Sequence, residues 1–323
     1  MKPASFASES LPDLADMRAA AVRIAPWAHR TPVLTSRSLN RRFGATLFFK
    51  AENLQRAGAF KFRGACNSVF SLTEGQAARG VLTHSSGNHG AALALAARER
   101  GIPSWVVMPD GAPEVKVAAV RGYGATVVEC GATQGAREEA AARLQVETGA
   151  SFIHPYDDPR VIAGQGTAAL ELLDQTAELD RIIVPVGGGG LLSGTAIAVG
   201  ESAPGVKVWA AEPATVDDAY RSFRAGRREA AGPGPTVADG LRTTLSPRTF
   251  RALKERVSDV IRVEERDIIE AMRWAWERLK TVIEPSAAVP LAALLAKAPT
   301  SEERIGIVLT GGNVDLQRLP WSV

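Results

Sequence analysis

Short apolar runs alternate along the chain with longer alanine-rich segments in which apolar positions recur with helical spacing. The short runs predict strands and the longer segments predict helices, because strands repeat every two residues and helices every 3.6. The predicted strands cover residues 47–50, 81–84, 104–108, 126–129, 182–186, 206–211 and 305–309. The predicted helices cover residues 65–72, 91–100, 134–148, 166–173 and 267–280.

This alternation predicts the α/β class, with parallel sheets covered by helices on both faces. Pro185 lies in the strand predicted at residues 182–186, and because proline has no N–H to donate, we expect it near the end of that strand. We expect two domains, each with a largely parallel sheet flanked by helices. Residues 1–79 and 158–323 form the predicted large domain, and residues 80–157 form a small domain inserted within it.

The composition is that of an ordinary globular enzyme. The chain has 323 residues, of which 46% are hydrophobic and 23% charged, and its formal net charge is +3. The sequence has no dense block of lysine and arginine, so we expect no nucleic-acid partner. No apolar run approaches the ~18 residues of a spanning helix, and Glu9, Asp13 and Asp16 argue against a signal peptide. With only two cysteines, the chain fits a cytoplasmic location without membrane association.

Lys61 is the first candidate for chemistry. It stands between two phenylalanines and two glycines in the sequence GAFKFRGA, residues 58–65. A solvated lysine has a pKa near ~10.4 and is a poor nucleophile at neutral pH, but burial among rings and backbone lowers that pKa. Most lysines are surface charges. Lys61 is nevertheless a candidate for a Schiff base with an aldehyde, because its setting is typical of a neutral amine.

Four consecutive glycines, Gly187 to Gly190, lie between a predicted strand and the helix that follows Leu191. Backbone N–H groups without side chains in the way, together with a helix N-terminus, bind phosphate. The segment is not a P-loop, because no Gly-Lys-Ser or Gly-Lys-Thr follows. A tight strand-to-helix turn is the plainer interpretation, but one or two glycines suffice for such a turn, so we favour a phosphate site.

Ser85, Ser86, Asn88 and His89 lie in the sequence SSGNHG, residues 85–90, between a predicted strand and a predicted helix. Small hydroxyl side chains and free N–H groups at the start of a helix hold a carboxylate, and Asn88 adds a donor and an acceptor. An ordinary helix cap explains one serine but not the whole group. We therefore interpret this loop as a carboxylate-binding loop.

Glu212 and Asp218 flank a third loop, which follows the strand predicted at residues 206–211. Two carboxylates with a main-chain carbonyl between them are typical of a site for a hard cation such as Mg²⁺ or Ca²⁺. A solvated acidic turn is the alternative, and the residues alone do not decide between the two.

The lysine segment at residues 58–65, the loop at residues 85–90 and the glycine run at residues 187–190 together resemble those of the fold-type II pyridoxal-phosphate enzymes. The resemblance is closest to the family of serine racemases and serine/threonine dehydratases. The resemblance covers nearly the whole chain. Further landmarks in order are RTP (30–32), AGQGT (163–167), AEP (211–213), ADG (238–240), EP (284–285) and TGGNVD (310–315). The resemblance implies a tryptophan synthase β-like α/β fold, pyridoxal 5′-phosphate as cofactor and a homodimer.

The resemblance also implies roles for particular residues. Lys61 would hold the cofactor through a Schiff base, Asn88 would hydrogen-bond the cofactor's phenolic oxygen, and Thr310 would face its pyridine nitrogen. Its phosphate would be bound by Gly187, Gly188, Gly189, Gly190 and Leu191. The substrate carboxylate would be bound by Ser85, Ser86, Asn88 and His89. A divalent cation, Mg²⁺ or else Ca²⁺ or Mn²⁺, would be bound by Glu212, the carbonyl of Val216, and Asp218.

The expected activity is that of an L-serine/L-threonine-type dehydratase, an ammonia-lyase that converts a hydroxy amino acid into a 2-oxo acid and ammonia. The neutral hydroxyl of Thr310 favours this β-elimination, because an uncharged pyridine nitrogen stabilises a carbanion less. Lys61 would then remove the α-proton. Ser86 leaves serine racemase as an alternative, since racemase-like members carry this serine on the cofactor face opposite the lysine.

The substrate side chain is left open by the sequence. In racemase-like relatives the position of Arg137 faces the substrate, and an arginine there would bind a second carboxylate, which favours 3-hydroxyaspartate. A surface arginine on the helix at residues 134–148 is an equal interpretation. Phenylserine is a further alternative. A cysteine-synthase-like β-replacement is less favoured, because those enzymes typically have threonine in place of His89.

Overall fold

The computed structural model of the chain describes residues 10–112, 114–232 and 234–321, and within them it builds two sheets. The strands of the large sheet, in spatial order, are β1 (Val33–Leu34), β2 (Thr46–Lys50), β10 (Arg304–Val308), β7 (Arg181–Pro185), β8 (Lys207–Pro213) and β9 (Asp259–Val263). Those of the small sheet are β5 (Thr126–Cys130), β4 (Ser104–Pro109), β3 (Val81–His84) and β6 (Ser151–Phe152). Neighbouring strands are parallel except β1 and β2.

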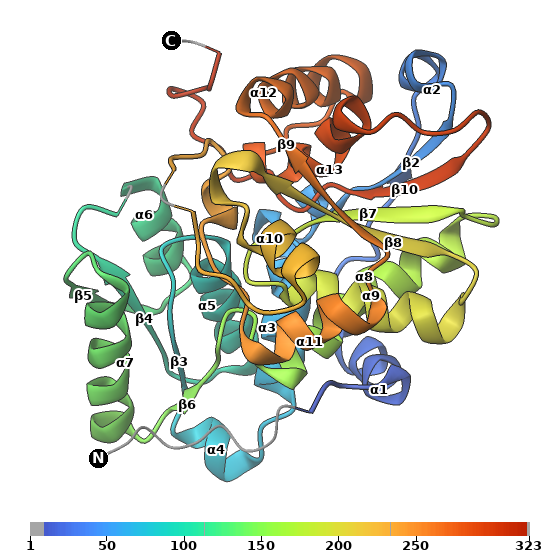
Figure 1. Cartoon of the computed structure of the whole chain (residues 1–323). Coiled ribbons are helices and arrows are strands. Elements are labelled where there is room, and N and C mark those ends of the chain that lie inside the picture. Colours follow the sequence, from blue (N-terminus) through green and yellow to red (C-terminus); the bar gives the residue numbers. More distant parts are fainter. Residues whose placement is uncertain (1–9, 113, 233, 322–323) are drawn as a thin grey trace.

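The two sheets lie side by side, and helices cover both faces of each (Figure 1). The helices around the large sheet include α1 (Leu14–Ile24), α2 (Arg37–Phe43), α8 (Pro159–Gln175), α9 (Gly190–Ser202), α10 (Asp218–Ala225), α11 (Pro247–Arg256), α12 (Glu265–Trp274) and α13 (Pro285–Ala296). Those around the small sheet are α4 (Glu74–Ala78), α5 (Asn88–Arg100), α6 (Glu114–Gly122) and α7 (Gln134–Thr148), and α3 (Lys61–Phe70) packs on both α5 and α8.

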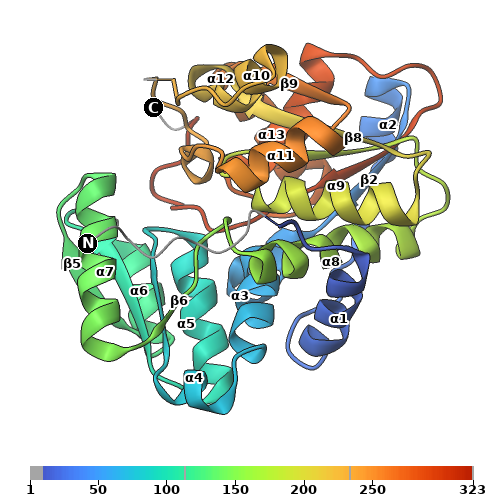
Figure 2. The same ribbon diagram turned by 60° about the horizontal axis from the view of Figure 1, so that its bottom comes forward.

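Alternate residues of a central strand pack on opposite faces of the large sheet. In β7, Ile183 belongs to the core beneath α12 and α13, whereas Ile182 and Val184 belong to the core beneath α1, α8 and α9. Figure 2 shows α8 and α9 running along the same side of this sheet. Since both faces are buried, the strand reads as a continuous apolar run, as expected for a parallel sheet.

The small sheet is covered in the same way. Leu82 and Val107 pack against α7, while Val81 and Val106 face the cores that α5 completes on the other side. The α/β class and the two largely parallel sheets flanked by helices are therefore confirmed. The domain boundaries at residues 80 and 157 stay a prediction. None of the helices in the described ranges is both long and apolar enough to cross a membrane.

Several element boundaries differ from those predicted. The helix expected at residues 166–173 begins at Pro159, because Asp158 caps it and Pro159 fits the first helical position. The segment predicted as one helix at 267–280 ends as a short π-helix, Ala275–Leu279. The short strands β1 and β6, and β9, were not predicted. Pro185 is the last residue of β7, as expected from its missing N–H.

Candidate active site

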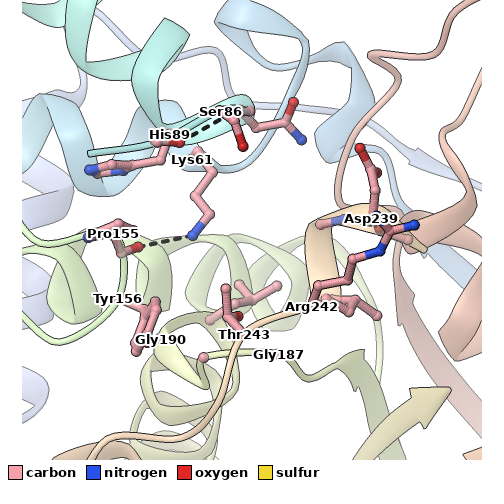
Figure 3. A pocket seen from close by; sticks show the side chains of 18 of the residues that line it. Lys61, Ser86, His89, Pro155, Tyr156, Gly187, Gly190, Asp239, Arg242 and Thr243 are labelled. Atoms are coloured by element: carbon pink, nitrogen blue, oxygen red, sulfur yellow. Dashed lines mark hydrogen bonds between the residues drawn. The ribbon is translucent and has the colours of Figure 1, made fainter. Parts of the chain in front are cut away.

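A cavity of about 310 Å³ lies where the two sheets meet, and strands of both sheets end at it. Residues that follow β3, β7 and β10 line it: Ser85 to His89, Gly187 to Leu191, and Thr310. Ligands of parallel α/β sheets bind in this position, beyond the carboxyl ends of the strands. Figure 3 shows Lys61 and Ser86 on one side of the cavity, with Gly187, Gly190 and Arg242 across from them.

Four helices begin at this cavity without a side-chain cap. Their N-cap residues are Phe60 (α3), Gly87 (α5), Gly189 (α9) and Glu284 (α13), and none of these side chains accepts a hydrogen bond from its own helix. The first N–H groups of a helix carry partial positive charge and need an acceptor. Their convergence makes the cavity suited to a molecule with several anionic groups.

Lys61 is the first residue of α3, one turn earlier than the predicted helix start. Its Nζ donates to the main-chain carbonyl of Pro155 at 2.9 Å, and the ring of Phe60 lies 5.1 Å away. Burial lowers the pKa of Lys61 to about 8, and the nearby carboxyl of Glu284 opposes this shift. The amine therefore loses its proton more readily than a solvated lysine does, as the sequence predicted from its surroundings.

The glycine loop is shaped by close packing. A Cβ built on Gly188 would lie 2.3 Å from the ring of Tyr156, so a side chain there would displace that ring. Gly189 has a φ of +85°, in the left-handed region that favours glycine. The loop then continues directly into α9, whose first residue is Gly190. This arrangement fits a phosphate held by main-chain N–H groups.

The loop that carries Asn88 turns from β3 into α5. The hydroxyl of Ser85 accepts from the main-chain N–H of Gly87 at 3.3 Å, and Ser86 lines the cavity. Burial, then Lys61, lowers the pKa of His89 well below its usual value. Its Nε2 lies 3.3 Å from the carbonyl of Ile153, which can only accept, so the neutral ring carries its proton on Nε2.

Arg137 and Thr310 complete the set of predicted residues around the cavity. Arg137, on α7, lines the cavity, and its Nε is buried without a hydrogen-bond partner among the described residues. Thr310 is buried, and its carbonyl accepts from the N–H of Phe60 at 3.0 Å. The structure thus brings every predicted cofactor and substrate residue to one cavity, although it does not test the role of any of them.

The polar residues that line the cavity without a role assigned from the sequence include Lys116, Tyr156, Asp239, Arg242 and Glu284. Lys116 donates to Asp239 at 2.5 Å and so joins a helix beside the small sheet to a loop of the large sheet. Burial, then Asp239, raises the pKa of Glu284 to about 8. Glu284 and Asp239 stood out in the sequence only as parts of the landmarks EP and ADG, and the other three lie in segments without a motif.

The predicted metal residues lie elsewhere, at the carboxyl end of β8. Glu212 and Asp218 are both buried, and within the described ranges neither has a lysine or arginine as ion-pair partner. Burial raises the pKa of Asp218 to about 6, and burial with the Asp218 charge raises that of Glu212 well above its usual value. No group of three or more histidine, cysteine, aspartate or glutamate side chains suited to a metal occurs among the described residues.

Comparison with known proteins gives one consistent result. Residues 24–311 match the family model described as pyridoxal-phosphate dependent enzyme. The β-hydroxyaspartate dehydratase of Paracoccus denitrificans is 50% identical over 97% of this chain and 99% of its own length. The serine racemase of Arabidopsis thaliana is 51% identical over 96% of this chain and 95% of its own. The structure of maize serine racemase superposes with a TM-score of 0.93, at 46% identity over 95% of each chain.

The chain therefore belongs to the pyridoxal-phosphate dependent enzymes, in the fold-type II group that contains serine racemases, threonine deaminases and hydroxyaspartate dehydratases. The predicted family and the enzyme class, that of ammonia-lyases and racemases, are confirmed. The cavity fits the cofactor of this family on three counts: a lysine with one protein partner, a side-chain-free glycine loop, and uncapped helix starts.

Proposed function

We propose that this member of the pyridoxal-phosphate dependent enzyme family is a dehydratase whose preferred substrate is 3-hydroxyaspartate. The sequence alone favoured L-serine or L-threonine, with 3-hydroxyaspartate as an alternative. The relatives that match over nearly their whole length include a β-hydroxyaspartate dehydratase and an L-threo-3-hydroxyaspartate ammonia-lyase of Saccharomyces cerevisiae, which support the alternative.

The observation that carries this proposal is Arg137. Its Nε is buried in the cavity wall without a hydrogen-bond partner among the described residues. A guanidinium stays charged at every physiological pH, and a buried donor without a partner is costly. A second carboxylate on the substrate would satisfy this donor, and the planar arginine fork matches a carboxylate. Serine and threonine have no second carboxylate to accept a hydrogen bond from this donor.

Different residues around the cavity would bind different groups of the cofactor. Lys61 would bind its aldehyde carbon covalently, and the N–H groups from Gly187 to Leu191 would bind its phosphate at the start of α9. Asn88 would hydrogen-bond its phenolic oxygen, and Thr310 would offer a neutral hydroxyl to its pyridine nitrogen. Pyridoxal phosphate, when bound, supplies an electron-withdrawing ring that makes the α-proton of an attached amino acid acidic.

The chain's own groups then carry the elimination. The uncapped start of α5, with Ser85 and Ser86, binds and orients the α-carboxylate of the substrate. Lys61 would act as the base that removes the α-proton, and its pKa of about 8 suits a base near neutral pH. The β-hydroxyl leaves as water. Hydrolysis of the product returns one water and gives the 2-oxo acid and ammonia.

Serine racemisation is the second candidate function, and Ser86 favours it. Ser86 and Lys61 approach the cavity from two different elements, the loop before α5 and the start of α3. Racemisation needs one group that removes the α-proton and another that delivers a proton to the opposite face. Several relatives are serine racemases. The two activities share Lys61 and do not exclude each other.

A divalent cation at Glu212, the carbonyl of Val216, and Asp218 is also part of the proposal. Both carboxylates lack a lysine or arginine as ion-pair partner among the described residues; burial raises the pKa of each, and the charge of Asp218 adds to the rise at Glu212. Mg²⁺, or Ca²⁺ or Mn²⁺, would remove the repulsion between the two carboxylates, with oxygen ligands of the kind it prefers. The cation would stabilise the loop after β8. Dimerisation and a cytoplasmic location stay predictions of the sequence.

A substrate panel tests the main proposal. We expect the holoenzyme to convert 3-hydroxyaspartate with a higher kcat/KM than L-serine or L-threonine. Arg137→Leu should lower kcat/KM for 3-hydroxyaspartate roughly 10- to 100-fold, because a hydrogen bond to a charged group contributes about 1.5–3 kcal/mol, and should change the value for L-serine little. Arg143→Leu is the matched control, an exposed arginine on the same helix that pairs with Glu139.

Two outcomes would contradict the proposal: a wild-type preference for L-serine or L-threonine, or an equal loss of kcat/KM for all substrates in Arg137→Leu.

The racemase candidate is tested in the same panel by following the enantiomers of serine. Ser86→Ala should lower interconversion much more than elimination, whereas equal loss of both would make Ser86 a binding residue only.

A further inference from the structure

Asn88 lies in a chain of three polar side chains that come from distant parts of the sequence. Its Nδ2 donates to Oε1 of Glu284 at 2.8 Å, and its Oδ1 accepts from Nδ2 of Asn313 at 3.0 Å. Glu284 is the residue just before α13, in the N-cap position, and Asn313 follows β10, so each approaches Asn88 from a different element. The amide of Asn88 is thus held at both of its ends.

The direction of the Asn88 amide is fixed by main-chain chemistry. Asn313 also donates from Nδ2 to the carbonyl of Ala57 at 2.8 Å. A carbonyl only accepts, so the nitrogen of Asn313 must face this side, and the atom of Asn88 that it meets must be the oxygen. The nitrogen of Asn88 therefore faces Glu284. One of its two protons is used there, and one N–H is left for a molecule in the cavity that Asn88 lines.

Glu284 is placed for this contact by its surroundings. Its side chain is buried, and its N–H donates to the carbonyl of Gly311 at 3.0 Å. A Cβ on residue 311 would lie 2.5 Å from Oε1 of Glu284 and 3.2 Å from Nδ2 of Asn88, so only glycine permits the carboxyl to reach the amide. The charged groups that act on Glu284 are Lys61, Lys116 and Asp239, and its carboxyl is not ion-paired with any of them.

We propose that Glu284 and Asn313 are positioning residues that hold the amide of Asn88 so that it presents an N–H donor, and not its carbonyl, to the phenolic oxygen of the cofactor. This inference rests on the proposed role of Asn88. A wrongly turned amide would set its carbonyl oxygen against the cofactor oxygen, and two acceptors repel. The two residues act on the cofactor through Asn88 and do not touch it.

Cofactor affinity tests the inference without relying on turnover. Titration of the apoprotein with pyridoxal phosphate, followed by the visible absorption band, gives a Kd for each variant. Glu284→Leu, which removes the acceptor, should raise Kd about 3- to 10-fold, the effect of one ordinary hydrogen bond, and should shift the band. Glu284→Gln is the matched control, since its amide oxygen still accepts from Asn88 and its length is the same.

A double-mutant cycle separates positioning from general support of the fold. In the Asn88→Ala background, Glu284→Leu should change Kd less than about 2-fold. An equal rise in both backgrounds would overturn the inference, because Glu284 would then act independently of Asn88. If Glu284→Leu does not fold, Asn313→Ala, at an exposed position, gives the same cycle.

The cycle also separates this inference from the proposed function. If Asn88→Ala leaves both Kd and the absorption band unchanged, the role of Asn88 in cofactor binding is wrong. If Asn88→Ala changes them and neither Glu284→Leu nor Asn313→Ala does, the role of Asn88 stands and only the positioning is wrong.

Discussion

Two lysines, the buried Lys50 and the half-buried Lys61, differ in the partners that the fold gives to their amines. Lys50 ends β2 and donates to Glu171 at 2.6 Å, to Gln175 at 2.8 Å and to the carbonyl of Thr31 at 2.8 Å. All three protons of its ammonium have partners. Lys61 begins α3, and its Nζ has a single hydrogen-bond partner among the described residues, the carbonyl of Pro155.

The region around Lys50 is an ionic cluster of four residues: Lys50, Glu52, Arg63 and Glu171. The guanidinium of Arg63 makes paired hydrogen bonds to Glu52, at 2.7 and 2.8 Å, and to Glu171, both at 2.8 Å. Two cations face two anions. Burial lowers the pKa of Lys50, but the hydrogen bond and charge of Glu171 oppose the shift, so the cluster is balanced within itself.

The cavity around Lys61 is not balanced in this way. Its helix starts lack side-chain caps, Arg137 has a buried donor without a partner in the described residues, and the carboxyl of Glu284 is shared with an amide. A buried polar group without partners is costly and is retained where a bound molecule supplies the partner. The two lysines therefore differ in the number of their partners among the described residues, and Lys50 is also the more deeply buried of the two.

The largest expected effect comes from removing Lys61. Lys61→Ala should lower the elimination rate by at least about 10²–10⁴-fold, the usual contribution of a general base, and further through loss of the Schiff base. Borohydride reduction followed by mass spectrometry should attach the cofactor to a peptide with Lys61 in the wild type only. Attachment at another lysine, or retained turnover, would break the comparison.

Removing a member of the ionic cluster should lower the stability of the fold and should not act directly on the reaction. Arg63→Met should lower the free energy of unfolding by about 3–5 kcal/mol, because it leaves buried carboxylates without their partner. Urea denaturation measures this. The matched control is Arg251→Met, whose exposed pair with Glu255 should contribute less than about 1 kcal/mol. Equal effects in the two variants would show that the cluster is not the structural support inferred here.

Glu212 and Asp218 form a third site for comparison. Both carboxylates are buried, and neither has a lysine or arginine as ion-pair partner among the described residues. Addition of Mg²⁺ to chelator-treated protein should raise the melting temperature by several degrees, since a ligand at 100 times its Kd stabilises the fold by about 2.7 kcal/mol. Asp218→Asn should remove most of this rise. Asp217→Asn should keep it, because Asp217 already pairs with Arg221 and Arg262; loss in both variants would argue against the proposed ligands.

The smallest expected effect is a difference in the pH dependence of stability. The pKa of Glu284 is about 8 in the folded chain and near 4.5 when unfolded, so the folded state binds the extra proton between these values. Stability from this group is present below pH 4.5 and is lost as the pH rises through 8. Apoprotein with Glu284→Gln should therefore show a flatter fall in melting temperature over this window than wild type, while the exposed-site variant Glu139→Gln should match wild type.

Local patterns predicted much of the fold, because strand and helix periods act over a few residues. The strands β3, β4, β5, β7, β8 and β10 were predicted to within a few residues, and Pro185 lies at the end of β7 as expected. The start of α8 was placed too late, since its early residues 159–165 show no simple period and the cap at Asp158 decides where the helix begins. The two-residue strands β1 and β6 are too short to carry a pattern and exist through pairing with their neighbours.

The sequence by itself predicted the glycine loop, the asparagine loop and Lys61 as parts of one site, because glycines, serines and a lysine between aromatic residues act through properties that short segments carry. Only the tertiary structure decided which groups these residues meet. Glu284 and Asn313 lie 196 and 225 positions from Asn88, and they set the direction of its amide. The fold brings the carboxylate of Glu171, on α8, to the amine of Lys50, and it brings only the main-chain carbonyl of Pro155, among the described residues, to the amine of Lys61. The number of partners around a buried group depends on distant segments packing together, and no local pattern encodes it.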